Sequence, residues 1–99
     1  MEKHEFEMNV IPRIITINKN LVSEIGIKSA YLLAVLDEES FVQKKEWFPM
    51  TIAELEKKST LTRYEQDVEI GVLEKYGLIE KRVNGLPAKR YFKVLRFNK

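Results

Sequence analysis

The chain has 99 residues and a mass of 11.7 kDa, the size of one small domain, which excludes a two-domain enzyme with a cleft between its halves. Its 44% hydrophobic residues and mean hydropathy of -0.29 are typical of a folded chain and exclude a disordered one. With a formal net charge of +2, no cysteine and the single histidine His4, it has no disulfide frame, thiol nucleophile or cysteine zinc site. No apolar run reaches the roughly 20 residues of a membrane span, and the first residues are acidic where a signal peptide would be basic. We therefore expect a cytoplasmic, non-enzymatic protein with no membrane contact, cofactor, metal or catalytic residue.

Residues 1–25 are predicted to form an extended N-terminal arm. Apolar residues alternate weakly along its first 17 positions, and Pro12 disfavours a helix just before it. We expect an edge strand near residues 13–17. The arm and the tail 95–99 are the segments left for a dimer contact, and the alternative for the arm is that it covers the core of its own chain.

The first predicted helix spans about residues 28–39. Apolar residues recur there at spacings of three and four, which is typical of a helix with a wide buried face. After a polar stretch come Trp47, Phe48 and Pro49, whose large apolar surface predicts core positions.

Two helix-start signals follow in succession. Thr51 with Glu54, and Thr62 with Glu65, both match the capping box, so helices are predicted to begin near Ile52 and Arg63. The first helix should end near residue 58, and the second should begin after a turn of about four residues. This is the layout of a helix-turn-helix. The residues predicted to form the buried face of the second helix are Val68, Val72, Leu73 and Tyr76.

A basic hairpin is predicted at the carboxyl end. Gly77 suits the end of a helix, residues 78–83 and 90–94 read as strands, and Asn84-Gly85 is a hairpin turn signal extended by residues 86–88. Residues 78–99 hold seven basic side chains and one acidic, for a net charge of +6, whereas residues 1–77 hold ten basic and fourteen acidic, for −4. Such asymmetry is typical of a nucleic-acid site, and the alternative is a solubilising tail.

The junction from Leu73 to Arg82, Leu-Glu-Lys-Tyr-Gly-Leu-Ile-Glu-Lys-Arg, resembles the join between recognition helix and wing in winged-helix proteins. The resemblance covers about residues 26–95 and predicts an α+β fold, a winged helix-turn-helix over residues 26–99 with about three helices and a two- or three-stranded antiparallel wing sheet. The stretch from Gly85 to Phe92 also resembles wings of plasmid and phage proteins of low-GC Gram-positive bacteria, including replication initiators and accessory proteins that bind transfer origins.

The resemblance implies sequence-selective binding to double-stranded DNA, with the recognition helix at the major groove and the wing on the backbone or in the minor groove. In this chain residues 63–76 carry a net charge of −2, which opposes close approach to phosphates, so we expect the wing to supply most of the affinity. Lys89 or Arg90 is expected near the wing tip, suited to a narrow A-tract minor groove. The candidate wing residues are Lys81, Arg82, Asn84, Gly85, Lys89 and Arg90. The candidate helix-turn-helix residues are Thr60, Thr62, Arg63, Tyr64 and Gln66.

The expected role is that of a protein that marks an origin of transfer or replication on a mobile element for a relaxase or a replication protein. One small domain buries little DNA surface, so a homodimer on spaced, A/T-rich repeats is expected. Two alternatives stay open. The same fold serves transcriptional repressors, and winged helices also serve as protein-interaction adaptors.

Overall fold

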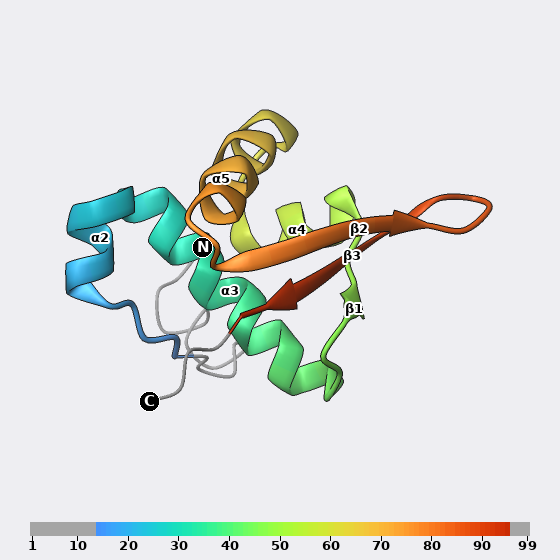
Figure 1. Ribbon diagram of the computed structural model, residues 1–99, viewed down its shortest axis with the longest axis horizontal. Coiled ribbons are helices and arrows are strands. Elements are labelled where there is room, and N and C mark those ends of the chain that lie inside the picture. The colour runs from blue at the N-terminus through green and yellow to red at the C-terminus, as the bar shows by residue number, and fades with distance from the viewer. Residues whose placement is uncertain (1–13, 96–99) are drawn as a thin grey trace, which may run out of the picture.

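The computed structural model describes residues 14–95, an α+β arrangement of four helices and one three-stranded antiparallel sheet of order β1-β3-β2. The helices pack together as one body, and the β2–β3 hairpin projects from it (Figure 1). The α+β class expected from the sequence is therefore confirmed. The described elements in chain order are α2 (Lys19–Ile25), α3 (Ile27–Gln43), β1 (Phe48–Pro49), α4 (Ile52–Ser59), α5 (Arg63–Lys75), β2 (Ile79–Asn84) and β3 (Lys89–Val94).

The amino-terminal segment differs from the expectation. Residues 14–18 have no regular structure and residues 19–25 form helix α2, so the predicted strand near 13–17 is wrong over its described part. The side chain of Asn18 caps α2 by accepting a 3.0 Å hydrogen bond from the Leu21 N–H. Gly26, with φ of +93°, then separates α2 from α3. The rest of the arm and most of the tail lie outside the described residues, as does their predicted dimer contact.

Helix α3 confirms the helix predicted at 28–39 and extends it to Gln43. Leu32 and Leu36 are fully buried on one side of it, against the sheet and α5. The extra turn is stabilised by the Gln43 amide, which donates to the Glu39 carboxylate at 3.0 Å and to the Pro49 carbonyl at 3.2 Å. The chain leaves the helix at Lys44 in the left-handed conformation.

Both predicted capping boxes are present. Thr51 Oγ1 accepts from the Glu54 N–H at 3.0 Å, and Thr62 Oγ1 accepts from the Glu65 N–H at 3.2 Å, while each glutamate accepts from the threonine N–H at 2.9 Å. These signals are local, so they fix where α4 and α5 begin without help from the rest of the fold. Leu61, in the turn between the two helices, is 6% exposed and packs in the core.

The buried face of α5 agrees with the prediction at Leu73 and differs from it elsewhere. Gln66, Ile70 and Leu73 are buried, whereas Val68 and Tyr76 are 42% and 50% exposed. The predicted and observed sets share Leu73 and both recur at helical spacing, and the apolar pattern does not choose between them because the observed face begins with a glutamine. Polar partners inside the core decide the rotation of the helix.

An ion pair joins the first turns of α3 and α5. Lys28 Nζ lies 2.9 Å from Glu65 Oε2. The hydrogen bond from Lys28, followed by that from the Thr62 backbone, holds the pKa of Glu65 below its ordinary 4.5, and the hydrogen bond to Glu65 raises the pKa of Lys28 above 10.5. The pair therefore contributes stability between these two values, and the contribution is lost as pH falls through the lowered pKa of Glu65.

Glu65→Gln keeps an oxygen for the capping box and removes the charge. We expect this variant to be slightly less stable than the wild type at neutral pH, with the difference shrinking as pH falls below 4.5 and vanishing below the lowered pKa of Glu65. Urea denaturation at a series of pH values measures it, with Glu74→Gln on the exposed side of α5 as control. A difference that persists in strong acid would contradict the ion-pair explanation.

The sheet packs against α3, and its strand β2 also contacts α5. Phe48 of β1 pairs with Phe92 of β3, and both rings are fully buried with centroids 6.2 Å apart. The predicted core position of Phe48 is confirmed, whereas Trp47 is only half-buried. Within residues 14–95, no helix combines the length and apolar character that a membrane crossing requires.

Candidate nucleic-acid interface

The β2–β3 hairpin confirms the strand–turn–strand expected at 78–94 and presents two different faces. Residues paired across an antiparallel ladder share a face, and successive residues alternate between faces. The register pairs Lys81 with Phe92 and Val83 with Arg90 on the face that continues the core. The outer face is formed by Glu80 with Lys93, Arg82 with Tyr91 and Asn84 with Lys89.

Two of the predicted cations stand free on the hairpin. Lys81 and Lys89 are exposed, and neither forms an ion pair with any residue in the described range 14–95. They lie on opposite faces of the ribbon and in different strands. Exposed, unpaired lysines are suited to phosphates because no internal contact has to be broken to bind them.

Arg82 lies on the outer face, stacked on an aromatic ring. Its guanidinium carbon is 4.2 Å from the centroid of Trp47, and Lys93 Nζ lies 5.9 Å from the same ring. Lys93 is also paired with Glu46 at 3.0 Å. The stacking holds the guanidinium plane while its edge stays exposed. Lys93 was not among the predicted site residues. Its position two residues after Tyr91, and therefore on the same face of β3, is a sequence signal that could have identified it.

Trp47 is the only tryptophan of the chain, so its fluorescence reports this stack. We expect Arg82→Ala to shift the emission of Trp47 and to destabilise the fold by only about 0.5–1 kcal/mol, the size of an exposed cation–π contact. Lys81→Ala, one residue away on the other face, is the matched control and should leave the emission unchanged. Identical spectra for the wild type and Arg82→Ala would contradict the stacking.

Arg90 lies near the tip of the hairpin, as predicted, in the second ladder pair from the turn, but its side chain points toward the helices instead of outward. Its Nε donates to the Met50 carbonyl at 3.1 Å, its Nη2 donates to Gln66 Oε1 at 3.1 Å, and its guanidinium lies 4.9 Å from the Phe92 ring centroid. Burial lowers the pKa of Arg90, against the opposing influence of Asp67. Because its Nε and Nη2 groups bind acceptors inside the protein, Arg90 fastens the hairpin to the helices.

Gln66 was also predicted to contact DNA, but its side chain is not accessible. Its side chain is fully buried, and its Nε2 donates to the carbonyls of Ile52 and Leu61, both at 3.1 Å. Its Oε1 accepts the bond from Arg90. One amide thus ties together the first turn of α4, the turn before α5 and the hairpin.

The remaining helix candidates are exposed at the amino-terminal end of α5. Thr60, Thr62 and Arg63 are exposed, and Tyr64 is 77% exposed. The Thr62 hydroxyl is occupied by its capping role. The link between Gln66 and Arg90 places this end of α5 beside the part of β3 that follows the hairpin turn. The same helix face also exposes Asp67, so the structure brings the predicted residues together with an acidic neighbour.

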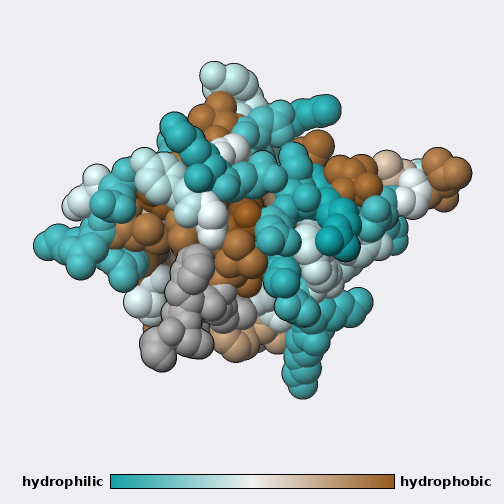
Figure 2. All heavy atoms as spheres, in the orientation of Figure 1, coloured by the Kyte–Doolittle hydropathy of each residue, from teal (hydrophilic) through white to brown (hydrophobic). Residues whose placement is uncertain are grey.

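The hairpin tip is apolar, which sequence reasoning missed. Leu86 is 101% exposed and Val83 is 58% exposed, and Figure 2 shows hydrophobic surface at the far end of the hairpin. The only sequence signal was a leucine inside a turn where polar residues are usual. Gly85 has φ of +92°, so its candidate role is to shape the turn.

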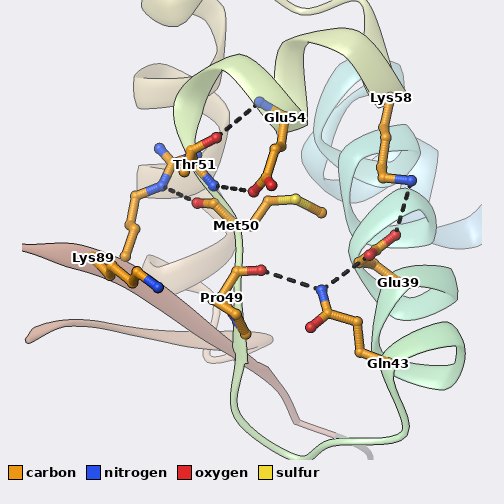
Figure 3. Close-up of a pocket in the computed structure, with 9 residues that line it drawn as sticks. Glu39, Gln43, Pro49, Met50, Thr51, Glu54, Lys58 and Lys89 are labelled. Atoms are coloured by element: carbon orange, nitrogen blue, oxygen red, sulfur yellow. Dashed lines mark hydrogen bonds and ion pairs between the residues drawn. The ribbon is translucent and has the colours of Figure 1, made fainter.

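A pocket of about 340 Å³ lies where α3, α4 and β1 meet the hairpin. Figure 3 shows Lys58 reaching Glu39 and Gln43 bridging Glu39 to Pro49. Glu39 is therefore already neutralised, by Lys58 at 3.4 Å. In the described part of the chain no cluster of acidic or histidine side chains could hold a metal ion. Most polar groups shown in the pocket therefore already have partners among the residues that line it.

No protein-family model, no curated protein and no solved structure matches this chain.

Proposed function

We propose that this protein is a winged helix-turn-helix protein that binds double-stranded DNA sequence-specifically, with α4 and α5 as the helix-turn-helix and the β2–β3 hairpin as the wing. The observation that carries the proposal is the exposed hairpin, in which no acidic residue occurs from Lys81 onward. Lys81 and Lys89 are free to bind phosphates, and counterion release makes such contacts favourable.

The position of the hairpin supports simultaneous contact by two elements. The hydrogen bond from Arg90 to Gln66 connects the start of β3 to the amino-terminal end of α5, where Arg63 and Tyr64 are exposed. A duplex lying across this junction meets α5 at the major groove and the wing along the adjacent minor groove. The acidic side chains of α5, among them the exposed Asp67 and Glu74, limit its electrostatic contribution, so the wing supplies most of the affinity.

The biological role we propose is the marking of an origin of transfer or replication on a mobile element, in the cytoplasm, as a homodimer on A/T-rich repeats that recruits a relaxase or a replication protein. The resemblance of residues 85–92 to wings of plasmid and phage proteins supports this role. A transcriptional repressor would use the same surface, and the genomic position of the bound sequence distinguishes the two roles.

Selection of bound sequences from a random duplex pool at about 0.15 M salt tests the proposal, because nonspecific phosphate binding is weak at that ionic strength. One enriched motif is expected, and repeats separated by a helical turn would indicate a dimer. Absence of enrichment, together with no salt-dependent binding to any duplex, would overturn the proposal. The adaptor function would then be favoured, since Tyr64 and Val68 expose apolar surface on α5.

A further inference from the structure

The wing tip combines an apolar apex with cationic flanks. Leu86 is entirely exposed in the turn, and Val83 is more than half exposed just before it. Lys81, Arg82 and Lys89 flank them in the two strands. A fully exposed leucine makes no contact that stabilises the folded chain, so its place at the apex has no explanation within the protein itself.

A two-stranded ribbon does not fit an undeformed minor groove. The strands of a hairpin are about 4.8 Å apart before side chains are counted, whereas the minor groove of B-DNA is only about 6 Å wide. The ribbon therefore has to open the groove in order to enter it. Apolar side chains open it by inserting between base pairs, which unstacks one step and bends the duplex toward the major groove.

We propose that Leu86 is such a wedge, which inserts between adjacent base pairs from the minor groove and kinks the DNA. This inference rests on the proposed function and adds to it a specific deformation of the bound duplex. Sequence preference then arises partly from how easily a step unstacks, and pyrimidine–purine steps such as TA are the most easily kinked.

The charges around the apex favour DNA over a protein as the occupant. Lys81 in β2 and Lys89 in β3 approach the turn and form no ion pair with any residue from 14 to 95. The sequence has no acidic residue between Lys81 and Leu95. The large hydrophobic residues exposed on the hairpin are Val83 and Leu86, too few for a standard protein interface, in which each partner buries roughly 800 Å². A single apolar side chain with cationic neighbours fits one base step and its phosphates.

The test measures binding and bending separately on the same duplexes. The probes are A/T-rich duplexes of about 20–30 bp with a central TA step, carrying a donor and an acceptor dye at their ends or 2-aminopurine at the central step. The wild-type protein should bend them by roughly 20–90° and raise 2-aminopurine fluorescence. Leu86→Ser should lose most of both signals while its affinity falls about tenfold or less, which corresponds to about 1.4 kcal/mol.

Leu86→Met retains an apolar, insertable side chain and is the matched control, expected to bend DNA like the wild type. Since Leu86 is fully exposed, all three proteins should unfold at the same temperature. Binding without bending or unstacking would overturn the wedge and leave the proposed function intact, as would full bending by Leu86→Ser. Failure of the wild type to bind any duplex would overturn both.

Discussion

Gln66→Ala is expected to lower the free energy of unfolding by about 3 kcal/mol, because it leaves several buried polar groups without partners and creates a cavity. The carbonyls of Ile52 and Leu61 lose their donor, and Arg90 Nη2 loses its acceptor. In a domain of this size the melting temperature should fall by roughly 12–24 °C. Urea denaturation followed by circular dichroism measures the change.

Glu74→Ala, on the exposed surface of the same helix, is the control and should change stability by no more than about 0.5 kcal/mol. A Gln66→Ala protein that is as stable as the wild type yet binds DNA more weakly would contradict the buried role. That result would support the sequence-based prediction that Gln66 contacts DNA.

The double variant Lys81→Ala, Lys89→Ala is expected to weaken DNA binding about 30-fold at 0.15 M salt, since each lost phosphate contact removes a factor of roughly 5 from the affinity. The slope of log K against log salt should become shallower by about 2. Both lysines are exposed and unpaired within the described residues, so stability should be almost unchanged. Fluorescence anisotropy over a salt series gives both quantities.

Two comparisons sharpen this result. Lys57→Ala, Lys75→Ala removes the same charge from other exposed positions, on α4 and α5, and should leave the slope nearly unchanged. Arg63→Ala, Tyr64→Ala tests the helix and should cost less affinity than the wing pair. If the helix pair costs more, the recognition helix rather than the wing dominates binding.

The choice of variants follows from the structure, because Arg90 is not equivalent to its neighbour Lys89. Replacing Arg90 would break bonds to Met50 and Gln66, and any loss of binding would mix misplacement of the wing with loss of charge. Lys89 has no such internal role in the described chain. Only the pair of free lysines therefore reports phosphate contacts alone.

The sequence determined by itself the features that depend on near neighbours. The two threonine–glutamate boxes fixed the starts of α4 and α5, because both partners of each box lie within one helical turn. Asn84 and Gly85 indicated the hairpin for the same reason. The apolar spacing of α3 was also sufficient to predict the helix, since a helix with one wide apolar face buries that face.

Tertiary structure alone decided which polar side chains face inward and which apolar ones face out. Gln66 and Arg90 come from segments 24 positions apart and meet backbone carbonyls that no sequence pattern marks. Their burial is favourable because the Gln66 amide and the Nε and Nη2 groups of Arg90 find hydrogen-bond partners there. Leu86 is exposed because the hairpin extends past the core and leaves its turn without neighbours (Figure 1). Local spacing carries information about helix starts and turns, whereas the satisfaction of a buried amide depends on the whole fold.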